Sequence, residues 1–138
     1  MKKFFAGVSI VIAVLLLMWG APLIVDATTS TVVTGDMATG TVTGTGAAIN
    51  VSLGWTPRVV LISNPSTTNP TVVYWHTSMG SAKGLKTVVT GTTPAVSYLS
   101  SLGVSSYTGS TTAGKGFTIG ADTDLNITGD TLMYEAHK

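Results

Sequence analysis

Residues 49–76, INVSLGWTPRVVLISNPSTTNPTVVYWH, decide the fold because they contain three short runs that favour β-strands. In the first run, at residues 49–54, apolar and polar residues alternate, as expected for a strand with one buried face. The runs at residues 58–63 and 71–76 are continuous and rich in β-branched and aromatic residues, which favour central strands. The proline-containing segments between the runs predict turns, because proline cannot donate to a sheet ladder.

The chain beyond residue 76 repeats this pattern of short strands and turns. Glycine, serine and proline separate the apolar runs, and no helical period of useful length appears after residue 26. We therefore expect residues 49–138 to form a mainly β head, an antiparallel β-sandwich or small barrel. The further strands are expected at residues 85–90, 96–99, 116–120, 125–128 and 131–136.

Residues 28–48, TTSTVVTGDMATGTVTGTGAA, are rich in threonine and glycine and precede the expected head. Their composition is typical of a linker, but residues 31–33 and 41–43 have strand character. We expect a partly extended arm that pairs with the head or with a neighbouring subunit.

Residues 4–25, FFAGVSIVIAVLLLMWGAPLIV, carry no charge and lie between two lysines and Asp26. As a helix they would extend roughly 33 Å, about the hydrocarbon thickness of a bilayer. The sequence thus predicts one N-terminal hydrophobic α-helix over residues 1–27, held in a membrane or in a hydrophobic helix bundle. A basic start and an apolar centre also fit a secretory signal that is removed. The expected anchor residues are Phe4, Phe5, Ile10, Ile12, Leu15, Leu16, Leu17 and Trp19.

Charge is scarce, at 9% of residues, and the chain has a formal net charge of +1. Nucleic-acid binding by a basic face is not expected, because phosphate affinity needs many lysine and arginine contacts. The absence of cysteine excludes disulfides and thiolate metal sites. A weakly charged, threonine-rich surface favours a subunit that packs against copies of itself.

The few groups capable of catalysis or metal binding do not form a recognisable site in the sequence. His76 and His137 have no acid and nucleophile at the spacing of a catalytic triad. Asp122, Asp124 and Asn126 occupy alternate positions, but the glycine and glutamate that an EF-hand requires are absent. We interpret their spacing as a strand that points three polar side chains to solvent. We expect no enzyme activity, cofactor, metal or small-molecule substrate.

Aromatic residues are spread along the expected strands rather than gathered in one segment. Such spacing is more typical of core and subunit contacts than of a ligand face. The candidate interface residues are Trp55, Tyr74, Trp75, Phe117 and Tyr134.

An ordered set of short motifs over residues 54–136 resembles small β-sandwich structural proteins of bacteriophage virions, of the head, surface or fibre type. The resemblance implies an oligomeric β-sandwich subunit with a structural or adhesive role. An apolar N-terminal segment departs from that pattern, and a phage particle that contains lipid would accommodate it. The motifs are GWTPRVV at 54–60, YW at 74–75, KTV at 86–88, GFTIG at 116–120, DLN at 124–126, GD at 129–130 and YEA at 134–136.

These features together predict a bacteriophage structural protein that self-assembles in the virion and is anchored by its N-terminal segment. Its expected partners are copies of itself, other virion proteins and a membrane or hydrophobic bundle, and its expected location is the virion or its membrane. One alternative is a pilin-like subunit of a cell-surface filament. Another is an extracellular adhesin or binding domain released after leader cleavage.

Overall fold

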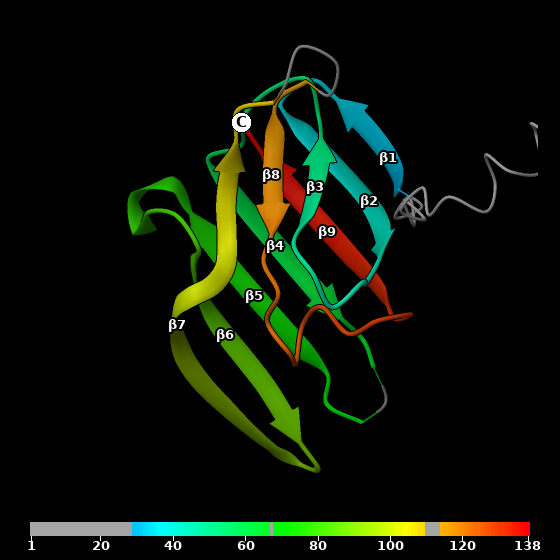
Figure 1. Ribbon diagram of the computed structural model, residues 1–138, viewed down its shortest axis with the longest axis vertical. Coiled ribbons are helices and arrows are strands. Elements are labelled where there is room, and N and C mark those ends of the chain that lie inside the picture. The colour runs from blue at the N-terminus through cyan, green and yellow to red at the C-terminus, as the bar shows by residue number, and fades with distance from the viewer. Residues whose placement is uncertain (1–28, 67, 110–113) are drawn as a thin grey trace, which may run out of the picture.

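A single sheet of nine antiparallel strands forms the described part of this chain, in the order β1-β2-β9-β4-β5-β6-β7-β8-β3 (Figure 1). The computed structural model describes residues 29–66, 68–109 and 114–138. The strands are β1 Thr29–Thr34, β2 Met37–Thr43, β3 Ile49–Ser52, β4 Val59–Asn64, β5 Thr71–His76, β6 Lys83–Thr90, β7 Thr93–Tyr107, β8 Gly116–Ile119 and β9 Thr131–His137.

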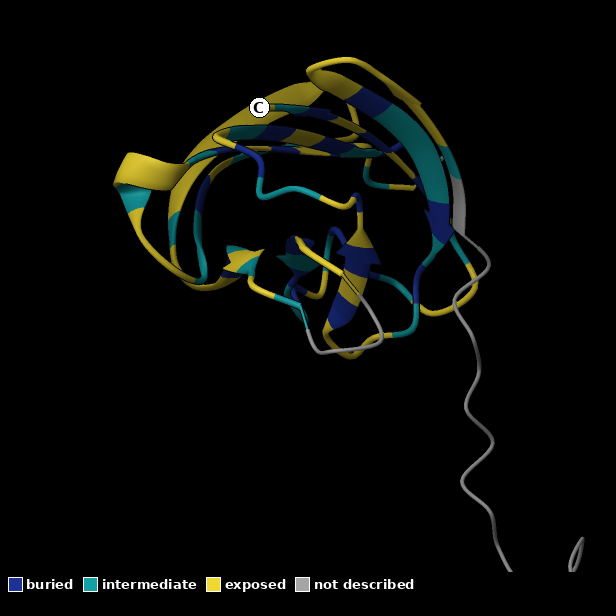
Figure 2. Ribbon diagram, turned by 90° about the horizontal axis from the view of Figure 1, so that it is seen from above, coloured by how far each residue is buried: buried dark blue, intermediate teal, exposed yellow. Residues whose placement is uncertain are grey.

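The mainly β prediction is confirmed, but the predicted antiparallel β-sandwich or small barrel is wrong. All nine strands belong to one sheet, which curls into a half-barrel, so that its two ends, β1 and β3, do not pair. Seen from above, the sheet is an arch with a smaller group of strands beneath it (Figure 2).

No α-helix occurs among the described residues, where the only helical element is the 3-10 turn η1 at Thr77–Met79. Within that same part of the chain, no helix has the length and apolar character needed to cross a bilayer. The helix predicted over residues 1–27, including every expected anchor residue from Phe4 to Trp19, lies outside the described residues.

The curl depends on a bend in the long strand β7. Its first half pairs with β6 and its second half with β8. The register between β6 and β7 shifts between the consecutive residues Lys83 and Gly84 of β6. At the bend, Leu102 adopts a φ of 60°, which L-residues rarely do. Gly103 follows, and a Cβ there would lie 2.2 Å from the carbonyl oxygen of Lys83. The bend therefore brings β8 and β3 under the arch and makes two layers from one sheet.

The core lies between the arch and these inner strands. Alternate residues of β4, β5 and β9 point inward and meet apolar side chains from β3, β8 and the second half of β7. The rings of Phe117 and Tyr134 pack edge to face, with centroids 5.3 Å apart. The largest fully buried apolar side chains are Trp75, Phe117, Ile62, Ile119, Leu125 and Leu132.

The first two strands come from the stretch that was expected to be an arm. They form a hairpin around Gly35, and β2 pairs with β9 from Met37 opposite His137 to Thr43 opposite Thr131. The hairpin thereby extends the arch to its outer edge, where the hydroxyls of Thr31 and Tyr134 form a hydrogen bond.

Candidate functional site

A row of large side chains crosses the outer, convex face of the arch. The strand register places Leu61, Tyr74, Leu85 and Tyr98 next to one another on β4, β5, β6 and β7. Residues at these alternate positions point away from the core. Their exposed fractions lie between 38% and 57%, so all four are open to solvent.

A second row lies two residues further along the same strands. It contains Met133 of β9, Val72 of β5 and Val96 of β7, which are also exposed. Ser63 and Thr87 stand between them. We call the apolar members of both rows the outer apolar band, which consists of Leu61, Val72, Tyr74, Leu85, Val96, Tyr98 and Met133.

The outer apolar band is almost free of charge. The two rows hold no lysine or arginine, and their one carboxylate, Glu135, lies 2.6 Å from the ring nitrogen Nε2 of His137. An antiparallel sheet with one face in water normally alternates apolar and polar residues, whereas β4 and β5 are apolar on both faces. A contiguous exposed apolar surface of this kind marks a contact surface.

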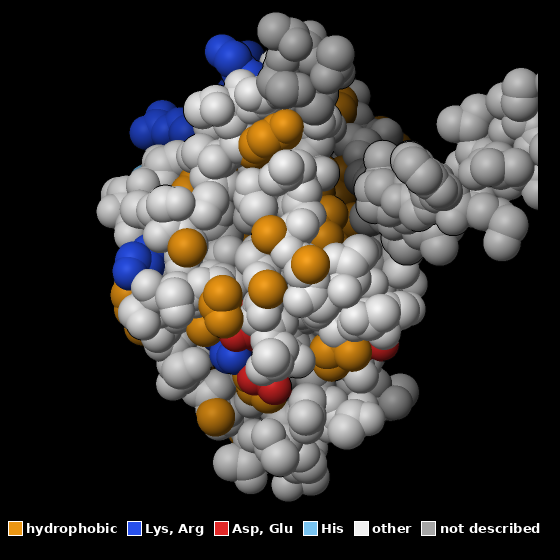
Figure 3. Space-filling model, viewed as in Figure 1, with side chains coloured by type: hydrophobic (Ala, Val, Ile, Leu, Met, Phe, Trp, Pro, Cys, Tyr) orange, Lys and Arg blue, Asp and Glu red, His pale blue; other side chains and the backbone are white. Residues whose placement is uncertain are grey.

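The opposite side of the molecule differs. Viewed from the side of β3 and β8, hydrophobic side chains form small separate patches in a mostly polar surface (Figure 3). The outer face of the arch is thus the more continuous apolar surface of the described residues.

Of the five interface residues predicted from the sequence, Tyr74 belongs to the outer apolar band. Trp75, Phe117 and Tyr134 are at most 4% exposed and lie in the core, so their predicted role in subunit contacts needs correction. Their positions in the strands point them inward. Trp55 is partly buried against the core, and its indole nitrogen has no hydrogen-bond partner among the described residues.

Sequence reasoning missed the other members of the band. The available signal was the pair of continuous apolar runs at residues 58–63 and 71–76, which indicate strands covered on both faces. Val96 and Tyr98 had a weaker signal, since they alternate with Ala95 and Ser97 along the first half of β7.

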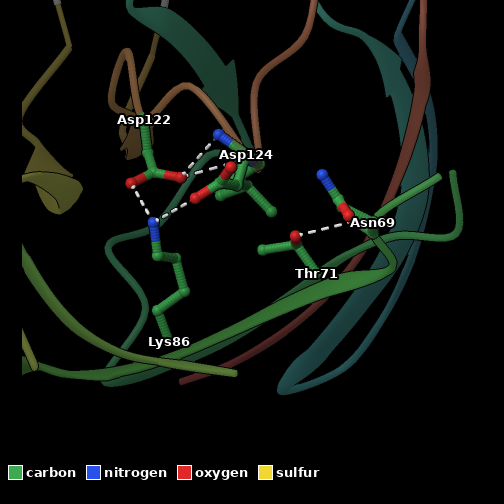
Figure 4. Close-up of polar contacts among 6 residues, drawn as sticks. Asn69, Thr71, Lys86, Asp122 and Asp124 are labelled. Carbon is green, nitrogen blue, oxygen red and sulfur yellow. Dashed lines mark hydrogen bonds and ion pairs between the residues drawn. The ribbon is translucent and has the colours of Figure 1, made fainter. Parts of the chain in front are cut away.

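A cluster of charged groups lies on the concave side of the arch (Figure 4). Lys86 of β6 places its Nζ 2.7 Å from Oδ2 of Asp122 and 2.8 Å from Oδ2 of Asp124. The other carboxylate oxygen of Asp122 accepts hydrogen bonds from the amides of Asp124 and Leu125. The cluster therefore fastens the loop between β8 and β9 to the sheet.

The electrostatics of the cluster favour a charged lysine. Burial lowers the pKa of Lys86, but hydrogen bonds and charge attraction from Asp122 and Asp124 outweigh it, so the pKa is raised. An ammonium group already occupies the position that a cation would take. The described residues contain no group of three or more histidine, aspartate or glutamate side chains placed to hold a metal ion.

The interpretation of residues 122–126 as a solvent-facing strand is wrong. They form a turn-rich loop in which Asp122 and Asn126 are buried. The side chain of Asn126 accepts from the amide of Thr45 and donates to the carbonyls of Ala47 and Gly120. These polar side chains hold the loop against other parts of the chain by hydrogen bonds and ion pairs. Partners so far apart in the sequence cannot be recognised from a local pattern.

The two histidines make local contacts. Nδ1 of His76 accepts from the amide of Ser78, 3.0 Å away, and thereby caps the turn η1. His137 contacts Glu135 on its own strand. Neither arrangement assembles a base, a nucleophile and an orienting acid.

The outer apolar band is thus the strongest candidate for a functional site in the described residues. Comparisons with known protein families, with curated proteins and with solved structures found no match.

Proposed function

We propose that this protein is a self-assembling structural subunit of a bacteriophage virion, and that its outer face packs against further copies of the chain. The observation that carries the proposal is the outer apolar band, which stays exposed on strands whose other face forms the core. The virion setting is supported by the resemblance of residues 54–136 to small phage structural proteins.

Copies of the chain are the partners that fit this surface best. The two rows that contain the band have no lysine or arginine to attract an acidic partner, and their one carboxylate, Glu135, already contacts His137. A surface of this kind gains its binding energy from apolar burial, at roughly 25 cal/mol per Å². Identical patches can meet across a two-fold axis, which is the commonest symmetry of protein oligomers.

The size of the face sets an upper limit on the area that such a contact can bury. The arch contains seven strands, β1, β2, β9, β4, β5, β6 and β7. Their six spacings of about 4.8 Å and a strand length of about six residues, or 20 Å, give a flat area of roughly 580 Å². A standard interface buries about 800 Å² on each partner. Two convex faces bury less than this flat area, so further buried area must come from the flanking loops and from the apolar stretch at residues 4–25.

The curvature of the arch determines where the contact is closest. Two convex faces touch along a few neighbouring strands, and the middle strands of the outer apolar band are β4, β5 and β6. Leu61, Tyr74 and Leu85 form an unbroken row across those strands. We therefore assign the centre of the contact to these three side chains.

The uncharged stretch at residues 4–25 supplies a second apolar element. Its transfer out of water, into a virion membrane or against the same stretch of neighbouring copies, adds to the driving force for assembly. Other virion proteins are further partners in this setting.

Sedimentation of the full-length protein in mild detergent tests the proposal. We expect the wild type to form oligomers and Leu85→Lys to weaken association at least tenfold, because a charge would be buried in the contact. Ser52→Lys is the matched control, since Ser52 is exposed on β3 in the opposite layer. A wild type that stays monomeric, or a Leu85→Lys variant that associates normally, would overturn the proposal.

Mass spectrometry of purified particles tests the setting. We expect the chain among the structural proteins of a phage. Its recovery in cell-surface filaments, or as a free extracellular monomer that has lost about its first 27 residues, would refute the virion assignment.

A further inference from the structure

Within the described residues, the strand β1 is an edge of the sheet that nothing covers. Among the described residues, β2 is the only strand that pairs with it. Proteins usually protect such edges with charge, proline, a bulge or a covering loop. The sequence of β1, TSTVVT, contains no charge and no proline, and its six residues pair with β2 without a register shift. Its outer side therefore offers a regular row of backbone donors and acceptors.

The other free edges are better protected. The strand β3, at the opposite end of the sheet, has only four residues. The loop before it is tied to Asn126, which binds Thr45 and Ala47. The first half of β7 also has a free side, but it carries Pro94. Among the described strands, β1 is thus the longest free edge that has no charge, proline, bulge or covering loop.

Apolar side chains are exposed on both faces of β1. Val32 lies on the outer face and is 64% exposed. Val33 pairs with the buried Ala38 and so faces inward, yet it is 47% exposed because the sheet ends there. A further strand alongside β1 would cover both valines at once.

We infer that β1 of one copy pairs with β1 of a second copy in antiparallel orientation, which extends the sheet across a two-fold axis. This inference rests on the proposed function and names one contact by which the copies associate. With Val32 opposite the partner's Val32, Thr31 stands opposite Val33. Directly opposed residues in an antiparallel pair point to the same face, so this register joins the two outer faces.

The composition of β1, TSTVVT, favours a second copy as the partner. An uncharged strand has no like charges to repel when it meets itself, and β-branched residues pair well across strands.

Cysteine cross-linking tests the contact directly, since the chain has no cysteine of its own. Opposed residues in an antiparallel pair have Cα atoms about 4.5–5.5 Å apart, within the range that a disulfide spans. We expect Val32→Cys in the full-length protein to form a covalent dimer under mild oxidation. Ser52→Cys, on the far edge of the sheet, should give at least tenfold less dimer.

A second variant separates this inference from the proposed function. Val32→Lys places a charge on the edge, and when it is added to Leu85→Lys, which weakens the outer-face contact, we expect it to lower the remaining association at least tenfold. A wild type that does not associate would overturn both proposals. If the wild type associates but Val32→Cys cross-links no better than Ser52→Cys, or Val32→Lys added to Leu85→Lys lowers association no further, the pairing of β1 is wrong while assembly through the outer face stands.

Discussion

The two faces of β4 and β5 have similar apolar composition and opposite surroundings. Ile62, Val73 and Trp75 point inward and are at most 1% exposed, whereas Leu61 and Tyr74 point outward and are about 40% exposed. The difference comes from the bend in β7, which brings a second layer under the inner face alone. A strand that is apolar on both faces thus indicates that both faces are to be buried. The fold of the whole chain determines which of the two is buried within one molecule.

Substitution of adjacent residues on β5 gives the largest expected contrast between the faces. Trp75→Ala removes a buried side chain, whose indole nitrogen also donates to the carbonyl of Gly80, and should lower the free energy of unfolding by about 3–5 kcal/mol. Tyr74→Ala should lower it by less than about 1 kcal/mol in the monomer. Urea denaturation of both variants at low protein concentration measures the difference. Equal losses would mean that the outer face is covered within one chain.

The positions of the strands could be predicted from residue patterns, but their assembly into one sheet could not. Alternation and β-branched runs identified β3, β4, β5 and β9 because these patterns are local. The bend at Leu102 and Gly103 left no such signal, since leucine has no preference for a positive φ. Because the bend could not be predicted, the two layers of strands were expected to be two separate sheets. The predicted sandwich was wrong for this reason.

The candidate site was predictable in kind but not in its members. Tyr74 and Trp75 are consecutive, so one of them had to face outward, but the sequence does not say which. The ion cluster is harder still, because Lys86 meets Asp122 across 36 residues and Asp124 across 38. Such pairs depend on the folded chain and not on any local pattern.

The ion cluster gives an intermediate effect that depends on pH. Lys86→Met should lower the free energy of unfolding at pH 7 by about 1–3 kcal/mol, because it removes charged hydrogen bonds to Asp122 and Asp124. The pKa of Lys86 is raised in the folded protein, so its contribution is complete below the ordinary lysine pKa and disappears as the pH rises through the folded value.

Urea denaturation between pH 7 and pH 11 tests this dependence. We expect the stability difference between the wild type and Lys86→Met to shrink only at the alkaline end. The comparison is made at each pH because burial also raises the pKa of Tyr134, which makes both proteins lose stability in the same direction. A difference that stays constant to pH 11 would contradict the role of the ion pairs.

The smallest expected effect comes from the hydroxyl that joins the core to the edge of the arch. Tyr134→Phe keeps the ring that packs against Phe117 but removes the hydrogen bond to Thr31 of β1. We expect the free energy of unfolding to fall by about 1 kcal/mol and the amides of β1 to exchange faster with solvent deuterium. Tyr98→Phe is the matched control, since Tyr98 is exposed on the outer face.

Faster amide exchange that is confined to β1 in Tyr134→Phe would show that the core holds the edge strand in place. Equal amide exchange in both variants would show that β1 depends on its pairing with β2 alone.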